Sequence, residues 1–422
     1  MITRKNRTHC IVCDTKLVQD YVIIGDQYPS AVYPKVGADY KSDMQASSLN
    51  LTKCPNDDCG LVQLSNEYDL SYVLANYPYE SGTTATMKGI LGDIVEETEK
   101  LVPLNGNDVV LDIGGNDGTM LNLLAKPVKN RVNMDAAAGV NSVIDAPDYI
   151  KIQGLFNSKA YLELNIGLPK VIFSVAMFYH LNDPLSFCKD VYEIMDDDTV
   201  WCLQMTYLGT MLEDNIFDNI VHEHVSYYSL KSLEYLMNKV GLEVCEAKIV
   251  KSYGGSIRAY IKKSRKGFSQ DRVEYKHVAE YERNHKTNDL SALLDFNTRS
   301  QMLKDFTKTL IGHLVEKYGK MVAFGASTKG NMICQFVGLD STYIKCVLDN
   351  NEKKVGLMTT GTDIPIVDET EYLKSVPPYL FILPYYYTDF FISVIRKRLK
   401  KDESTYLIVP LPMPKFIKVT GV

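Results

Sequence analysis

Two histidines flank a glutamate in the segment NIVHEHVSYYSL, residues 219–230. Imidazole can accept a proton near neutral pH or ligate a metal, so His222, Glu223 and His224 fit a metal site, a proton-transfer site or a polar turn. The helical spacing H-E-x-x-H of zinc proteases is absent, which argues against catalytic zinc. Ser229 has the place of an N-cap before the helical pattern that follows.

Four of the nine cysteines form two closely spaced pairs near the start of the chain. They are Cys10 and Cys13 in CIVC, and Cys54 and Cys59 in CPNDDC. Two such pairs are typical of a structural zinc site in which four thiolates join two tight turns. We therefore predict a zinc-binding module over residues 1–75, irregular between the pairs, with His9 as an alternative ligand.

A glycine-rich turn joins a predicted strand, residues 108–114, to a predicted helix, residues 118–126. Glycines let the backbone approach a ligand, and an acidic residue after the next strand can hold ribose hydroxyls. NAD and S-adenosylmethionine both fit this pattern, but the full G-x-G-x-x-G spacing of pyrophosphate binders is absent, which favours S-adenosylmethionine. The predicted cofactor-binding residues are Asp112, Gly114, Asn116, Gly118 and Asp135.

Strand and helix patterns alternate along most of the remaining chain. This alternation predicts an α/β fold with a mostly parallel, doubly wound sheet over residues 76–265. Residues 266–310 are charged, show helical spacing and are expected to form connecting helices. Residues 311–422 repeat the α/β pattern, which predicts a second Rossmann-like domain.

The loop GASTKGN, residues 325–331, lies between a strand pattern and a helix pattern of this second domain. Backbone N–H groups, Ser327 and Lys329 at such a place could face a diphosphate. The glycine spacing and the lysine-hydroxyl pair of a Walker A loop are missing, which argues against ATP hydrolysis.

Composition excludes several classes of protein. The 422 residues suggest two to three domains, and 45% hydrophobic with 23% charged residues is usual for a globular protein. The net charge of −6 argues against nucleic-acid binding. No apolar run approaches the roughly 20 residues that span a membrane, and no signal-peptide pattern follows the start, so we expect a cytoplasmic protein.

Several motifs occur together in a specific order over nearly the whole chain. They are the two cysteine pairs, YPYESGTTATM, VLDIGGNDGT, HEHVSYYSL, KSYGGSIRAYI, GASTKGN and LDNNEKKVGLMTTGTDIPI. In this order the chain resembles the S-adenosylmethionine-dependent C-methyltransferases that act on nucleotide-linked keto-deoxysugars. The resemblance implies a zinc-binding module, a central Rossmann-like methyltransferase domain and a C-terminal Rossmann-like domain that binds a nucleotide-diphosphate keto-deoxysugar.

The resemblance also implies a reaction and residues for it. A ketone at C4 of the sugar acidifies the C3 hydrogen, a base removes it, and the enolate carbon takes the methyl group. The implied catalytic residues are His224 as base, Glu223, His180, Tyr77 and Tyr79. The substrate-binding residues predicted with them are His222, Arg258, Ser327, Lys329, Asn331 and Asp349, although Arg258 lies in a strand pattern and could equally be a surface charge.

The chain departs from the family at Val221, where a tyrosine usually precedes His-Glu-His. Either Tyr77, Tyr79, Tyr227 or Tyr228 supplies the missing hydroxyl, or the substrate differs. An O- or N-methyltransferase acting on a nucleotide sugar, a catalytically silent scaffold and an NAD-dependent oxidoreductase are the alternative functions. We expect a monomer or a small homo-oligomer.

Overall fold

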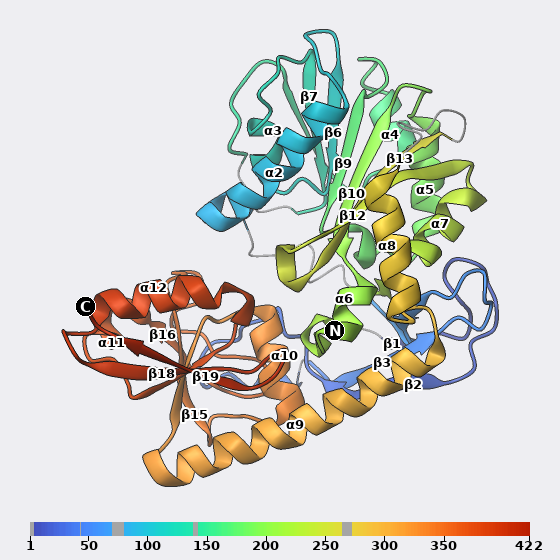
Figure 1. Cartoon of the computed structure of the whole chain (residues 1–422). Helices are drawn as coiled ribbons and strands as arrows, with labels where there is room; N and C mark the ends of the chain where they lie inside the picture. Colours follow the sequence, from blue (N-terminus) through green and yellow to red (C-terminus); the bar gives the residue numbers. More distant parts are fainter. Residues whose placement is uncertain (1–3, 43, 70–79, 138–141, 264–271) are drawn as a thin grey trace.

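The structure is a computed structural model that describes residues 4–42, 44–69, 80–137, 142–263 and 272–422 (Figure 1). A small N-terminal module, a seven-stranded sheet and a six-stranded sheet follow one another along the chain. The α/β prediction is confirmed. Among the described residues, no helix combines the length and the apolar character needed to cross a membrane.

The N-terminal module contains more regular structure than the sequence predicted. Strand β1 (Arg4–Asn6) pairs with β5 (Asn66–Tyr68), and a separate antiparallel sheet has the order β11-β4-β3-β2. Its strands are β2 (Asp20–Gln27), β3 (Ser47–Lys53), β4 (Val62–Leu64) and β11 (Ser226–Tyr227). The prediction of an irregular chain between the cysteine pairs is wrong, because alternate apolar residues of β2 and β3, including Val22, Leu49 and Leu51, are buried in a shared core.

The central sheet has the order β12-β13-β10-β9-β6-β7-β8, in which β13 runs antiparallel to both of its neighbours and the other pairs are parallel. The strands are β6 (Val109–Ile113), β7 (Asn130–Asp135), β8 (Tyr149–Gln153), β9 (Val171–Val175), β10 (Val200–Thr206), β12 (Leu242–Val250) and β13 (Ser256–Lys263). All five residues of β6 are buried, as expected for a strand covered on both faces.

Helices cover both faces of this sheet. Apolar residues of α2 (Ala85–Leu101) and α3 (Thr119–Asn122) form one core with the sheet. The opposite core includes residues of α4 (Ser158–Leu162), α5 (Pro184–Glu193), α7 (Leu230–Lys239) and α8 (Val273–Asn284). The chain runs from β6 to β8 on one side and returns through β9 and β10 on the other. Such a reversal opens a crevice at the carboxyl ends of the strands, where ligands bind in this type of fold.

The predicted connecting helices are α8 and α9 (Leu290–Tyr318), and α9 continues beyond residue 310. Glu282 of α8 is buried, and its carboxylate accepts hydrogen bonds from the Tyr207 hydroxyl at 2.8 Å and from the Leu230 N–H at the start of α7 at 2.5 Å. A carboxylate at a helix N-terminus also satisfies the helix dipole. The connection is therefore fixed to the central domain.

The C-terminal sheet has the order β16-β15-β14-β17-β18-β19. Its strands are β14 (Met321–Phe324), β15 (Ile344–Asp349), β16 (Ile366–Asp368), β17 (Tyr379–Ile382), β18 (Ser404–Val409) and β19 (Lys415–Thr420). The helices of this domain are α10 (Thr328–Val337), α11 (Glu369–Tyr372) and α12 (Thr388–Arg398). Its first three strands lie in the same relative order as β6, β7 and β8, so the two domains share a topology.

One apolar core joins the three parts of the molecule. It contains residues of β2 and β3, of α9 and of β14, together with Leu208, Ile220 and Val221 from the segment between β10 and β11. Figure 1 shows this segment, with α6 (Leu208–Glu213), between the central sheet and the other two parts. The His-Glu-His motif therefore lies where all three parts meet.

Candidate active site

The glycine turn after β6 has the geometry of a ligand-binding loop. Gly114 has φ 75° and Gly118 has φ 82°, in the left-handed region that favours glycine. A Cβ on Gly114 would lie 2.9 Å from Met177 Cγ, and a Cβ on Gly118 would lie 2.7 Å from the Tyr149 hydroxyl. The backbone therefore approaches its neighbours too closely for a side chain at either position.

Asp135 and Asn116 shape this loop. The Asp135 carboxylate accepts hydrogen bonds from the N–H groups of Asn116 at 2.8 Å and Ala137 at 2.7 Å. The Asn116 side chain accepts from the Ser81 N–H at 2.9 Å, in the one-turn helix η2 (Ser81–Thr83) before α2. Gly82 N–H donates to Asp117 in the same way, at 2.8 Å. The start of α2 is thus fastened to the glycine loop.

Asp112 lies beneath the loop with its side chain almost fully buried. Both of its carboxylate oxygens and Oδ1 of Asn133 lack a hydrogen-bond partner within the described chain. Burial, with Asp135 and Asp117 nearby, raises the pKa of Asp112 well above its ordinary value. A polar ligand bound at the glycine loop could provide hydrogen-bond partners for these buried atoms. The loop therefore fits the adenosyl part of S-adenosylmethionine.

All five predicted cofactor residues therefore meet at the carboxyl end of β6 and β7. Sequence reasoning missed Asp117 and Asn133. Asp117 lies inside the glycine motif, so its position in the sequence could have predicted a role in the loop. Asn133 could not be found in this way, because only the pairing of β7 with β6 brings it beside Asp112.

His224 lies beside His180 at the mouth of this crevice. His180 ends the one-turn helix η3 (Phe178–His180) after β9, and the two imidazole rings stack with centroids 5.5 Å apart. His224 is 9% exposed, and its Nδ1 lies 2.7 Å from the carbonyl oxygen of Asn219. A carbonyl can only accept, so Nδ1 carries the hydrogen and Nε2 of the neutral ring keeps its lone pair.

Burial and charge keep His224 neutral. Burial lowers the pKa of His224 well below its ordinary value, and His180 and Lys329 act in the same direction. Burial likewise lowers the pKa of His180 to about 4. Both rings are therefore in the unprotonated form at neutral pH, which is the form that can accept a proton.

The two histidines of the motif face different surroundings. His222 is 1% exposed, its Nε2 lies 3.0 Å from Ser47 Oγ of β3, and its ring packs against Tyr68. These contacts place His222 inside the N-terminal module, which is a structural role, and its predicted contact with substrate has no support in this geometry. Glu223 between them is buried, and burial raises its pKa to about 7.

The loop after β14 repeats the geometry of the loop after β6. Gly114 N–H donates to Met134 O, and Gly325 N–H donates to Leu348 O, both at 2.8 Å. Asp349 then accepts from the N–H groups of Ala326 at 2.7 Å and Asn351 at 2.8 Å, as Asp135 does from Asn116 and Ala137. This second loop therefore has the shape of a nucleotide-binding loop.

Side chains of the second loop divide into two groups. Ser327 caps α10 by accepting from the Gly330 N–H at 3.0 Å, and Lys329 in the first turn of α10 lies over the Tyr386 ring. Asn331 is buried, and its amide binds the Ser30 carbonyl at 3.2 Å and the Thr362 hydroxyl at 3.5 Å. Asn331 thus holds the N-terminal module against the C-terminal domain, so its predicted contact with substrate has no support here.

Charged groups connect the second loop to the His-Glu-His segment. Asp218 belongs to the one-turn helix η4 (Phe217–Asn219) and accepts a hydrogen bond from the Tyr385 hydroxyl at 3.2 Å. Burial raises the pKa of Asp218 to about 6, while the nearby charge of Lys329 opposes this rise. An ion pair between Glu80 and Lys353, at 3.0 Å, links the lead into α2 with the loop after β15. These contacts link the His-Glu-His segment and the lead into α2 with the C-terminal domain.

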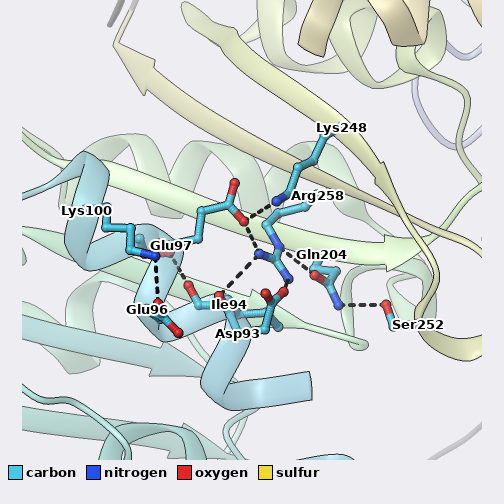
Figure 2. A network of polar contacts seen from close by, with 10 residues as sticks. Asp93, Ile94, Glu96, Glu97, Lys100, Gln204, Lys248, Ser252 and Arg258 are labelled. Carbon is cyan, nitrogen blue, oxygen red and sulfur yellow. Dashed lines mark hydrogen bonds and ion pairs between the residues drawn. The ribbon is translucent and has the colours of Figure 1, made fainter. Parts of the chain in front are cut away.

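Arg258 has partners within the protein (Figure 2). Its side chain, 1% exposed, pairs with Asp93 at 2.6 Å and with Glu97, both on α2, and its Nε donates to Gln204 Oε1 at 2.7 Å. Lys248 of β12 also pairs with Glu97. This network holds α2 on the sheet, so the prediction that Arg258 touches substrate has no support in this geometry.

Three residues complete the account of the predicted site. Tyr77 and Tyr79 lie outside the described residues. Val221 is 1% exposed within the common apolar core.

The four predicted metal ligands come together. Their sulfur atoms all lie within 4.8 Å of one another, with Cys10 and Cys59 at 3.8 Å and Cys13 and Cys54 at 3.4 Å. A zinc ion with Zn–S bonds of about 2.3 Å separates its ligands by about 3.8 Å, so the cluster fits tetrahedral zinc. The alternative ligand His9 instead lies beside the Thr8 hydroxyl at the surface.

Comparison with known proteins agrees with this architecture. The family described as "Methyltransferase domain" matches residues 87–247, and the family described as "C-methyltransferase C-terminal domain" matches residues 251–412. The C-methyltransferase NovU of Streptomyces niveus is 24% identical over 361 residues, which cover 85% of this chain and 85% of that protein. The two family matches and this similarity together indicate an S-adenosylmethionine-dependent C-methyltransferase.

Solved structures resemble parts of this methyltransferase. The plantazolicin methyltransferase BpumL, in complex with a triazolic desmethylPZN analog and SAH, is 12% identical, with a TM-score of 0.35 over 46% of this chain and 95% of that chain. An S-adenosylmethionine-dependent methyltransferase from Anabaena variabilis is 13% identical, with a TM-score of 0.35 over 46% of this chain and 90% of that chain.

The cysteine cluster predicts the metal content of the C-methyltransferase. The purified protein should contain one zinc ion per chain by elemental analysis, and Cys54→Ser should lose most of it and unfold at a lower temperature, because a structural zinc contributes directly to folding. The matched control is Cys245→Ser, since Cys245 is buried outside the cluster. Full zinc content in Cys54→Ser would contradict the assignment.

The cofactor loop predicts the effect of one added methyl group. A Cβ on Gly115 would lie 2.5 Å from Asp112 Oδ2 and 2.6 Å from Asn133 Oδ1, so Gly115→Ala should fill the cradle. We expect the Kd for S-adenosylmethionine, measured by calorimetry, to rise about 10- to 100-fold, from an overpacking cost of about 1–3 kcal/mol. Gly92→Ala on α2 meets open space and should bind normally; equal affinity in both variants would contradict this geometry.

Proposed function

We propose that this C-methyltransferase transfers a methyl group to C3 of a nucleotide-diphosphate-linked 4-keto-deoxysugar, with His224 as the base. The observation that carries the proposal is the hydrogen bond from His224 Nδ1 to the Asn219 carbonyl, which leaves Nε2 as a lone-pair acceptor. A C–H bond beside a ketone needs such a base, whereas transfer to an existing lone pair on oxygen or nitrogen needs no carbon acid.

The chain's part in the reaction is to move a proton and hold the acceptor. His224 Nε2 takes the C3 proton, the C3–H electron pair forms the C3–C4 double bond, and the C4 oxygen becomes an enolate. S-adenosylmethionine supplies the electrophilic methyl group and leaves as S-adenosylhomocysteine. The residues that would hold the cofactor are those around the first loop, including Asp112 and Asp135, and His224 later releases its proton to solvent.

Two features support a nucleotide diphosphate at the other end of the substrate. The loop after β14 has the nucleotide-loop geometry described above, with Asp349 at its base. Its cations, Lys329 and Lys354, suit the negative charge of a diphosphate, and the Lys354 ammonium donates to the Ala326 carbonyl of the loop at 2.7 Å. A sugar linked to this nucleotide would extend toward His224, because Lys329 lies close enough to influence the pKa of His224.

The base assignment predicts an isotope result. With a nucleoside-diphosphate 4-keto-deoxysugar deuterated at C3, the wild-type enzyme should give a C3-methyl product whose C3 deuterium has passed to water. His224→Ala should reduce turnover about 10²- to 10⁴-fold, the usual contribution of a general base. Mass spectrometry and NMR of the product measure both effects.

Three results separate the possibilities for this assignment. His313→Ala removes an exposed histidine on α9 and should behave as wild type. A methyl group on oxygen or nitrogen would overturn carbon methylation, and normal turnover in His224→Ala would reassign the base.

Glu223 predicts the pH dependence. Its pKa is raised to about 7 by burial, so its carboxylate ionises as the pH rises through neutrality. A negative charge on Glu223, next to His224 in the chain, would favour the protonated form of the imidazole. We therefore expect kcat/KM to increase as the pH rises through about 7, and this increase to be absent in Glu223→Gln. Because the pKa of His224 is lowered, its own titration should not produce a limb near 6.5. An unchanged profile in Glu223→Gln would contradict this assignment.

A further inference from the structure

Asn219 is a buried side chain whose amide has no hydrogen-bond partner among the described residues. It is 1% exposed, and neither Oδ1 nor Nδ2 of its amide has a hydrogen-bond partner in the part of the chain that the structure describes. The adjacent Asp218 is 0% exposed and has one unpaired carboxylate oxygen, Oδ2. Buried amides are normally satisfied, and one with both groups free indicates a place for a polar ligand.

The backbone of Asn219 fixes it beside the base. Its carbonyl oxygen accepts the His224 Nδ1–H at 2.7 Å and the Tyr227 hydroxyl at 3.3 Å. The η4 turn that contains Asn219 is held in turn by the C-terminal domain, since Phe217 packs on Phe336 and Asp218 accepts from Tyr385. The orphaned amide therefore belongs to the residue that orients the base.

The tyrosines that follow the motif do not supply the donor that the reaction needs. Removal of a proton beside a ketone places negative charge on the ketone oxygen, which requires a hydrogen-bond donor. Val221 has no polar group, and the Tyr227 hydroxyl already donates to the Asn219 carbonyl. Tyr228 is 0% exposed and packs against Phe178 in the core that contains Cys10 and Cys59, which is the zinc side of the segment.

We propose that the Asn219 side-chain amide donates a hydrogen bond to the ketone oxygen of the acceptor and stabilises the enolate, which makes Asn219 a catalytic residue. This inference rests on the proposed function, because it assigns the group that balances the charge created by the base. Nδ2 provides the donor, while Oδ1 can accept from a neighbouring sugar hydroxyl. The Lys329 ammonium, which influences both Asp218 and His224 electrostatically, adds positive charge on the same side.

The role makes a prediction about stability as well as rate. Because the amide has no hydrogen-bond partner among the described residues, Asn219→Ala removes no hydrogen bond from that part of the fold. We therefore expect it to unfold at the same or a higher temperature than wild type. The same variant should lose about 10²- to 10³-fold in kcat, the usual effect of removing an oxyanion donor. A structural asparagine would behave in the opposite way, with a lower unfolding temperature and a smaller loss of rate.

The experiment uses the full chain with the C3-deuterated nucleoside-diphosphate keto-deoxysugar. Four quantities are measured for wild type, Asn219→Ala and Asn219→Asp. They are kcat, KM, the rate of deuterium loss to water with S-adenosylhomocysteine in place of the methyl donor, and the Kd for S-adenosylmethionine. We expect both rates to fall together in both variants with an unchanged Kd. The pH profile of kcat/KM in Asn219→Ala should keep its shape, because the backbone carbonyl that orients His224 remains and no titratable group is added.

A matched control comes from the same segment. Asn215 is also buried, but its amide is paired with Arg299 and with the Pro412 carbonyl at 3.4 Å. Asn215→Ala should therefore lower the unfolding temperature and leave the rate of deuterium loss near that of wild type. If Asn219→Ala does not fold, Asn219→Asp, which keeps the size and lacks a donor when its carboxyl is ionised, provides the same test at a pH above the pKa of that carboxyl.

The outcomes distinguish the two levels of the argument. Deuterium loss at the wild-type rate in Asn219→Ala and Asn219→Asp would overturn the role of Asn219 and leave the proposed function standing. Retention of deuterium by the wild-type enzyme during methylation would overturn the enolate reaction and the role of Asn219 with it.

Discussion

The short strand β11 holds the catalytic segment in a position that the central sheet alone does not provide. Ser226 and Tyr227 pair with Gln63 and Val62 of β4, and Leu64 N–H donates to the Val225 carbonyl at 2.9 Å. Main-chain pairing fixes the register, and a shift by one residue would turn each side chain to the opposite face. His224, the proposed base, is therefore held by the N-terminal module, whose own turns are joined by the cysteine cluster. A zinc ion bound by that cluster would thus help to keep His224 in place.

Burial then determines the chemistry of this segment. The same exclusion of water lowers the pKa of His224 and raises those of Glu223 and Asp218. Apolar side chains at these positions would give a more stable fold. The reason is that buried polar atoms without a partner among the described residues, such as Asp218 Oδ2 and the Asn219 amide, cost free energy of folding. Strain of this kind is characteristic of functional sites, where a ligand supplies the missing partners.

The sequence predicted those parts of the site that depend on local geometry. The turn after β6 needs glycines at positive φ, so Gly114, Gly118 and Asp135 could be recognised from spacing alone. The partners of Arg258 on α2 lie 161 and 165 residues away, and the Ser30 partner of Asn331 lies in the N-terminal module. No local pattern therefore distinguished contacts within the protein from contacts with substrate. The position of His222 in the N-terminal module could not be predicted for a related reason, since the turn at the motif directs neighbouring side chains into different parts of the molecule.

The two Rossmann-like sheets show how one loop geometry can serve ligands of opposite charge. Asp135 and Asp349 each hold the loop of the preceding strand through the same pair of backbone hydrogen bonds. The surroundings then differ: the first loop adds Asp112 and Asp117, whereas the second adds lysines near its own carbonyls. In the proposed reaction, Asp117 and Asp135 beside the first loop suit the positive charge of a sulfonium, whereas the lysines beside the second loop suit a diphosphate. The two loops therefore share one backbone conformation, and the charged side chains beside each loop would determine which of the two proposed ligands it binds.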